Sequence, residues 1–339
     1  MHRPTTVLPF RTLTAAERAA NTEGRMSSVP RPPNAPRGTT HEIQVVTPYR
    51  LDLTVSALRR TATNRVDVYT SDGRYLRALG GFADPVIVSV TQPRADALAV
   101  SVSGGAGDTE GALMSVRRML GTERDLSGFH RHARAISWLA PLALRMRGLK
   151  PPRYPALFEA CANTILFQQV SLQAASAIMC RLVLALGRKV EYDRVPLAVF
   201  PSAEEFLGAD DTVIRAAGLS AGKLATLRRV GEAIATGAIS ESMLEERPSA
   251  DSALLLRSIK GIGPWTAAVI LLRGLGRLDL FPGNDSGVAA NLALVAGERV
   301  DAGSVVESLG SQRGMLYFCL LLARLEARGE IGRASDVAR

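Results

Sequence analysis

The pattern of apolar and polar positions along the chain changes character twice. Residues 1 to about 40 show no apolar periodicity and are rich in Pro, Arg, Thr and Ala, so we expect a flexible basic tail. Residues 41–122 combine short alternating runs with two helical stretches. From residue 129 to about 326, apolar residues recur every three or four positions, which predicts helices throughout. The polar residues 327–339 are expected to form a flexible C-terminus.

Within 41–122, five runs have the alternation and β-branched content typical of strands, namely 42–46, 65–70, 74–79, 85–90 and 97–102. Asp72-Gly73 is a hairpin signal between the second and third runs. Helical spacing marks Leu51 to Arg60 and Gly111 to Leu120. Because strands and helices do not alternate regularly, we predict a small antiparallel α+β domain followed by an all-α bundle, which is an α+β fold class overall.

A helix, a Gly-Ile-Gly turn and a second helix follow one another at about 249–273. Gly261 and Gly263 permit backbone angles and close approaches that side chains would block, and Pro264 suits the first turn of a helix. Such a turn exposes backbone N–H groups, and helix N-termini favour anions. We therefore expect the hairpin, through Gly261, Ile262, Gly263 and Thr266, to hold a DNA phosphate without reading sequence.

Composition bears on the binding partners of the protein and on its location in the cell. The formal net charge of +9 would concentrate a polyanion around it, although charge alone is also compatible with a solvated basic surface. The longest apolar run is nine residues, Met315 to Ala323, too short for a membrane helix. A secretory signal pattern is lacking and the three cysteines are scattered, so we expect a cytoplasmic, nucleoid-associated protein without contact to a membrane.

Four segments, 158–171, 218–237, 259–268 and 279–285, occur in the order and at the spacing of a known family. On these segments the sequence resembles the helix-hairpin-helix base-excision glycosylases, specifically the bacterial DNA-3-methyladenine glycosylase II branch that removes alkylated purines. The resemblance covers roughly residues 41–325 and implies two helical subdomains after the mixed domain. It also implies double-stranded DNA with damaged bases as the partner, and a monomer.

The resemblance implies that Asp285, at the end of the loop 279–285, is the catalytic carboxylate. Breaking an N-glycosidic bond builds positive charge on the sugar, which an ionised carboxylate stabilises. An alkylated purine already carries positive charge, so its departure needs little general acid. Asp285 could instead cap a helix beginning near Ser286, a role that Asn284 could also fill, and Asp279 is the nearest rival carboxylate.

Trp265 stands where bifunctional relatives present a Schiff-base lysine, and Lys260 is out of register with that position. The resemblance therefore implies base excision without strand cleavage, with the indole of Trp265 lining the base pocket. A tryptophan that simply fills the core is the alternative. Lys223 is expected to contact a phosphate, although a solvated lysine would look the same in sequence.

Base flipping requires a residue that fills the gap in the stack, and by position this wedge is Gln169. The alkylpurine prototype has an apolar side chain there, and Gln168 and Gln169 could instead bond local backbone. By resemblance, the backbone carbonyls of Arg257, Ile259 and Ile262 would hold a monovalent cation, Na+ or K+. We expect no other cofactor.

The sequence departs from the family pattern at two points, and three other interpretations of its function were weighed. The last helix keeps Arg313 but not the aromatic entry usual in the family, and aromatic residues make up only 5% of the chain, so the lesion range is open and includes deaminated or oxidised bases. Only Cys319 follows Asp285, which argues against a four-cysteine iron–sulfur cluster. A non-catalytic helix-hairpin-helix DNA-binding protein and a generic helical interaction module remain the alternatives from other classes.

Overall fold

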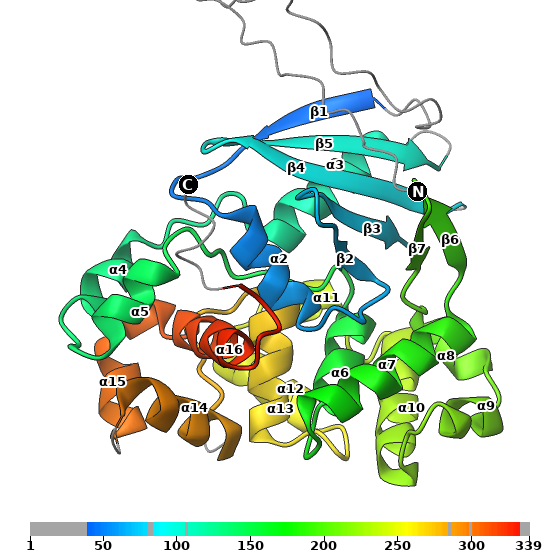
Figure 1. Cartoon of the computed structure of the whole chain (residues 1–339). Helices are drawn as coiled ribbons and strands as arrows, with labels where there is room; N and C mark the ends of the chain where they lie inside the picture. The colour runs from blue at the N-terminus through cyan, green and yellow to red at the C-terminus, as the bar shows by residue number, and fades with distance from the viewer. Residues whose placement is uncertain (1–38, 81–83, 106–107, 284–285, 298–299, 333–339) are drawn as a thin grey trace, which may run out of the picture. The chain divides into compact units, whose positions relative to one another are not determined.

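The computed structural model describes residues 39–80, 84–105, 108–283, 286–297 and 300–332. Its first part is a five-stranded antiparallel sheet with the strand order β1-β5-β4-β3-β2 (Figure 1). The strands are β1 (Thr39–Gln44), β2 (Asp67–Tyr69), β3 (Tyr75–Leu79), β4 (Val86–Arg94) and β5 (Ala97–Gly104). The predicted tail, apart from Thr39 and Thr40, and residues 333–339 at the predicted flexible end lie outside the described residues.

The predicted hairpin joins β2 to β3. Gly73 has a φ of 83°, a left-handed conformation that glycine adopts without strain, and its N–H donates to the Thr70 carbonyl at 3.1 Å. Helices α2 (Leu51–Arg59) and α3 (Thr109–Leu120) share one apolar core with the sheet. Asp108 caps α3 by accepting from the Gly111 N–H. The predicted elements of this domain are thus confirmed.

The remainder is mainly helical, and its helices form two apolar cores. One core joins α6, α7 and α8 to α13, and the other joins α4 and α5 to α14, α15 and α16. The helices are α4 (Ser127–Ala133), α5 (Leu139–Arg145), α6 (Leu157–Leu166), α7 (Leu172–Leu186), α8 (Ala203–Gly208), α9 (Asp211–Ala216), α10 (Ala221–Ala235), α11 (Glu241–Glu245), α12 (Ser249–Arg257), α13 (Pro264–Ile270), α14 (Ser286–Ala296), α15 (Ala302–Ser308) and α16 (Met315–Ala327), with a π-helical turn η1 (Leu271–Leu275) and a 3-10 turn η2 (Gly310–Gln312).

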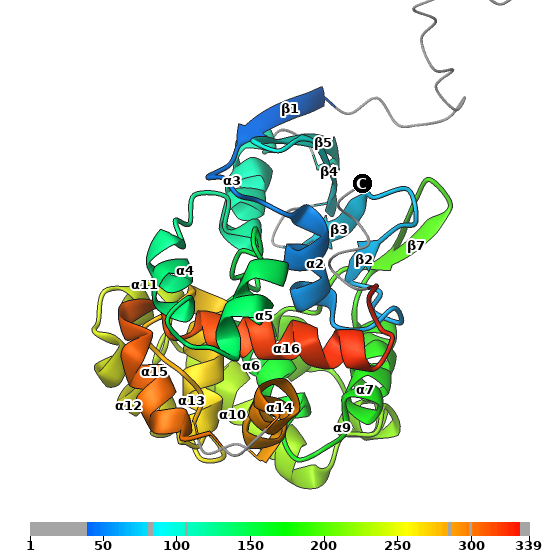
Figure 2. The same ribbon diagram turned by 60° about the vertical axis from the view of Figure 1, so that its left-hand side comes forward.

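The last helix packs under the first domain. Figures 1 and 2 show α16 passing beneath α2, and Leu53 and Ala57 of α2 belong to the same core as the apolar residues of α16. This contact between segments far apart in sequence places the end of α2 beside the helical subdomains. The predicted fold class, an antiparallel α+β domain followed by helical subdomains, is confirmed.

One feature of the helical region differs from the prediction. A two-stranded ribbon, β6 (Lys189–Tyr192) and β7 (Val195–Ala198), stands where only helices were expected. Asp193 and Arg194 both have positive φ, at 50° and 65°, which makes the tight turn of a two-residue hairpin. Its apolar side chains, including Tyr192 and Leu197, cover the face of β3 that carries Leu76. The ribbon therefore keeps the apolar residues on that face of the sheet away from solvent.

A buried ionic cluster ties the sheet to the helices. The Arg77 guanidinium of β3 donates to Asp67 Oδ1 at 2.6 Å and to Glu159 Oε2 of α6 at 2.6 Å. The Tyr75 hydroxyl donates to Asp67 Oδ1 at 2.7 Å. Burial raises the pKa of Glu159 to about 7, against the lowering effect of the Arg77 charge. One cation therefore serves two buried carboxylates.

Within the described part of the chain, none of the helices is long and apolar enough to cross a membrane.

Candidate nucleic-acid interface and base pocket

The helix-hairpin-helix is formed by α12, a turn at 258–263 and α13. Pro264 is the first residue of α13, and Gly263 precedes it in an extended conformation. Gly261 has a φ of 104°, and a Cβ added there would lie 2.1 Å from the Thr226 Oγ1 of α10. Thr226 is buried. The turn therefore packs directly on α10 and depends on glycine for both backbone angle and space.

Replacing Gly261 with alanine is expected to destabilise the protein by about 1–3 kcal/mol, because the new methyl group meets Thr226 and the left-handed angle strains any side chain. Chemical denaturation measures the change. Gly263→Ala is the matched control, since a Cβ there meets nothing within 4 Å. Equal stability of the two variants would contradict the packing described for this turn.

The carbonyl groups predicted to hold a cation lie at the same turn. The Ile259 carbonyl accepts from the Ile262 N–H at 3.0 Å. The Arg257 and Ile262 carbonyls accept from no backbone N–H among the described residues. Oxygen ligands suit hard cations, so the chemistry of these carbonyls is compatible with the predicted monovalent ion, which stays a prediction. Clusters of three or more His, Cys, Asp or Glu side chains able to hold a metal do not occur in the described part.

The turn between α6 and α7 is held against the hairpin. Gln168 Nε2 donates to Thr266 Oγ1 of α13 at 2.6 Å. Gln169 is exposed and has a φ of 53°. Gln168 thus makes a long-range contact rather than the local bond that we considered. The predicted wedge residue stands on a turn whose neighbour is anchored to the hairpin.

Lys223 has a structural role that the sequence did not reveal. Its Nζ donates to the Leu166 and Gln168 carbonyls at 2.8 Å each, at the end of α6. Burial lowers the pKa of Lys223. An ammonium group has three donor hydrogens, so these two bonds leave one for a further acceptor. The predicted phosphate contact therefore stays a prediction beside this observed one.

A pocket of about 130 Å³ lies between α6, α13, α14 and α16. These helices are in the lower half of Figure 1. The wall of the pocket contains the predicted Trp265, whose Nε1 is buried and has no hydrogen-bond partner among the described residues. We call it the Trp265 pocket. Its other lining residues are Arg60, Asn163, Thr164, Phe167, Val170, Leu172, Val269, Val288, Asn291, Tyr317, Leu320, Leu321 and Arg324.

Asn284 and Asp285 lie outside the described residues. The helix that follows them is described: α14 begins at Ser286, the residue after Asp285. Val288 and Asn291 of α14 both line the Trp265 pocket. Asp279, the rival carboxylate, is exposed and lines a different hollow, with Arg153 and Arg277. The chain therefore enters α14 beside the Trp265 pocket.

Sequence reasoning missed Arg60, at the end of α2. It is 6% exposed and has a φ of 62°. Its guanidinium carbon lies 4.3 Å from the centroid of the Phe167 ring, and its Nε finds no hydrogen-bond partner in the part of the chain that the structure describes. Burial lowers the pKa of Arg60, and the nearby Arg273 adds to this. Among the described residues, no carboxylate forms an ion pair with Arg60. The sequence around it, Leu58-Arg59-Arg60, gives no sign that this arginine is buried in the wall of the Trp265 pocket.

A family profile described as "HhH-GPD superfamily base excision DNA repair protein" matches residues 162–301. This part of the chain, which contains the hairpin and borders the Trp265 pocket, is similar to that superfamily. The predicted resemblance is confirmed.

Two curated proteins are similar in sequence to this chain. A DNA-3-methyladenine glycosylase of Bacillus subtilis is 29% identical over 51% of this chain and 57% of its own length. A probable bifunctional transcriptional activator/DNA repair enzyme AlkA of Mycobacterium tuberculosis is 32% identical over 67% of this chain and 46% of its own length. The chain thus spans about half the length of these curated relatives.

A solved structure supports the fold. The 3-methyladenine DNA-glycosylase from Archaeoglobus fulgidus superposes with a TM-score of 0.71, covering 83% of this chain and 97% of its own, at 24% sequence identity. The likeness extends over the antiparallel domain as well as the helices, because it covers more of the chain than the family profile does.

Proposed function

We propose that this protein is a DNA glycosylase that turns a damaged base out of the duplex and hydrolyses its N-glycosidic bond without cutting the strand. The observation that carries the proposal is the Trp265 pocket, which stands between the hairpin helix α13 and the helix that begins directly after Asp285. This position supports a site in which the hairpin holds a phosphate, Trp265 contacts the base and Asp285 supplies the carboxylate. Alkylated purines are the proposed lesion class, since curated relatives are named for 3-methyladenine.

In the proposed reaction, the hairpin N–H groups hold a backbone phosphate and Gln169 enters the gap left by the flipped nucleotide. The indole of Trp265 stacks on the base. The bond from the sugar C1′ to the base nitrogen breaks, its electron pair leaves with the base, and a water oxygen attacks C1′. Asp285 stabilises the positive sugar and accepts the proton of that water. The products are a free base and an abasic site.

The absence of a lyase step is proposed from the composition of the pocket. Strand cleavage by this superfamily requires an amine that attacks C1′. Lysine does not occur among the described lining residues of the Trp265 pocket. Lys223 donates to the end of α6 instead. We also propose that Arg257, Ile259 and Ile262 hold a monovalent cation, which would add positive charge beside the bound phosphate.

Purified protein and methylated duplex DNA test the proposal directly. Chromatography of released bases should detect 3-methyladenine, and strand breaks should appear only after alkali treatment. Breaks that appear without alkali would show a lyase. Failure to release any base from methylated, deaminated or oxidised duplexes would leave a DNA-binding protein without this chemistry.

A second lesion class is favoured by Arg60. A buried guanidinium on the pocket wall repels a base that is already cationic, as 3-methyladenine is in DNA. It attracts a neutral base that presents a carbonyl oxygen, because negative charge develops on that base as its bond breaks. Deaminated bases such as hypoxanthine have this character.

Arg60→Met is expected to lower hypoxanthine release about tenfold or more, the effect of losing one hydrogen bond from a charged group, and to leave 3-methyladenine release unchanged or faster. Single-turnover rates on the two duplexes measure the ratio. Arg60→Lys keeps the charge and is the matched control. Equal losses on both substrates would show that Arg60 only supports the fold.

A further inference from the structure

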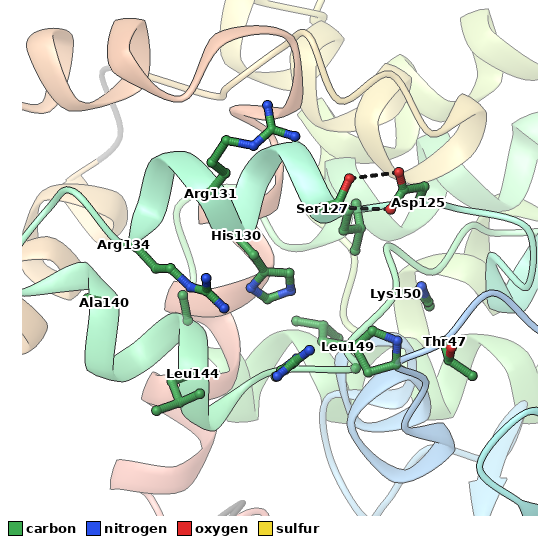
Figure 3. A pocket seen from close by; sticks show the side chains of 15 residues that line it. Thr47, Asp125, Ser127, His130, Arg131, Arg134, Ala140, Leu144, Leu149 and Lys150 are labelled. Carbon is green, nitrogen blue, oxygen red and sulfur yellow. Dashed lines mark hydrogen bonds between the residues drawn. The ribbon is translucent and has the colours of Figure 1, made fainter.

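A larger cavity, of about 390 Å³, lies in another part of the molecule, between α4, α5 and the segments 47–48 and 147–150 (Figure 3). We call it the α4–α5 pocket. It shares no lining residue with the Trp265 pocket, and the proposed base chemistry does not use it.

Cationic side chains dominate the lining of the α4–α5 pocket. Arg131, Arg134, Arg147 and Lys150 line it together with His130, against the single carboxylate of Asp125. In Figure 3 His130 lies between Arg134 and Lys150, whereas Arg131 points away from His130. None of the arginines in this set forms an ion pair with a described residue. Their charge is therefore not neutralised within the described protein.

Asp125 is already engaged elsewhere. Its carboxylate accepts from the Ser127 backbone N–H at 2.9 Å and from the Ser127 hydroxyl at 2.8 Å, and these bonds lower its pKa. It holds the start of α4 in place. A single carboxylate with this role does not balance four cations and a histidine.

Lys150 is a buried cation of the α4–α5 pocket. Lys150 is 2% exposed, and its Nζ donates to the Arg124 carbonyl at 2.7 Å without a carboxylate within ion-pair distance in the described part. Burial lowers the pKa of Lys150, and burial followed by Arg147, Arg134 and Lys150 lowers the pKa of His130. Burying like charges together is costly unless an opposite charge joins them.

We propose that the α4–α5 pocket binds a phosphate group, carried either by a small nucleotide or by a DNA strand away from the base being excised. The guanidinium groups of Arg134 and Arg147 present paired donors that match phosphate oxygens. The Lys150 ammonium adds a further positive charge to the lining. Leu149 and Ala143 add apolar wall, which suits a ligand with more than a bare anion.

The test follows the His130 ring by NMR during pH titration of the full chain, with its signal assigned by His130→Gln. Sulfate is the first probe because it keeps its charge over this range. Bound sulfate should raise the pKa of His130, since a nearby anion stabilises the imidazolium. Arg134→Gln with Arg147→Gln should weaken sulfate binding at least about tenfold. Arg215→Gln, an exposed arginine of α9, should leave it unchanged.

Two further arms identify the source of the phosphate. Displacement of sulfate by an undamaged duplex indicates a strand phosphate, and displacement by a nucleoside monophosphate but not by the duplex indicates a small ligand. Either result supports the proposal. A His130 signal that responds to neither sulfate, nucleotide nor duplex overturns it. Base release is measured separately in the same variants and should not change, so a protein without glycosylase activity leaves this test intact.

Discussion

Asp285→Asn is expected to lower single-turnover base release by at least about 10²-fold while duplex binding is retained, because the amide cannot stabilise positive charge on the sugar. The proposed hairpin contacts use backbone groups distant in sequence from position 285, so affinity for undamaged duplex should stay within about threefold of wild type. Rates on methylated and deaminated duplexes and affinity by fluorescence anisotropy measure the two effects.

Asp279→Asn is the matched control for this variant. Asp279 belongs to the same loop but is exposed beside Arg277, away from the Trp265 pocket. Its replacement removes an equal charge and should leave the rate near that of wild type. If Asp279→Asn lost activity and Asp285→Asn retained it, the catalytic assignment would pass to Asp279.

Arg77→Met is expected to cost about 3–5 kcal/mol of stability, the range for breaking a buried ion pair by removing one partner. Asp67 and Glu159 would be left as buried carboxylates without a cation, and each is at most 4% exposed. Chemical denaturation measures the loss. Arg94→Met is the matched control, because its pairs with Glu42 and Asp96 are exposed to solvent and should contribute little to stability. Similar losses in both variants would contradict the role of burial.

Glu159→Gln separates charge from packing in the same cluster. The folded pKa of Glu159 is raised to about 7 from an ordinary 4.5, so this group makes the folded state progressively less stable as pH rises through that interval. The amide removes that dependence and leaves Arg77 with Asp67 alone. The stability of Glu159→Gln relative to wild type should therefore improve between pH 5 and pH 7.5, as followed by thermal unfolding.

The hairpin, the α6–α7 turn and α10 contact one another, so the segments proposed to bind DNA are held together. Gln168 joins the α6–α7 turn to the hairpin through Thr266, and Lys223 joins the same turn to α10. Gly261 places the hairpin on α10 through Thr226. A phosphate bound at the hairpin, as proposed above, would thereby be coupled to the turn that carries Gln169. Precise placement of this kind is what a flipped base requires.

Most secondary structure followed from periodicity. The hairpin at Asp72-Gly73, helix α2 and the helix-hairpin-helix were all predicted, because turn residues and apolar spacing act over a few positions. The ribbon β6–β7 was missed because four-residue strands in a helical context have too few positions to show a period. Its signal was the alternation in Lys189 to Ala198 around Asp193-Arg194.

The sequence by itself determined the fold class, the position of the hairpin and the resemblance to base-excision glycosylases, since these depend on motifs whose residues are near one another in the chain. The sequence also predicted that Trp265 lines a base pocket; Trp265 does line a pocket, and the binding of a base there is a proposal. Only the tertiary structure decided the roles of Arg60, Gln168, Lys223 and the cations of the α4–α5 pocket. The reason is physical: the effect of a charge or a polar group depends on its burial and on partners brought from distant segments, and neither is recorded in local spacing.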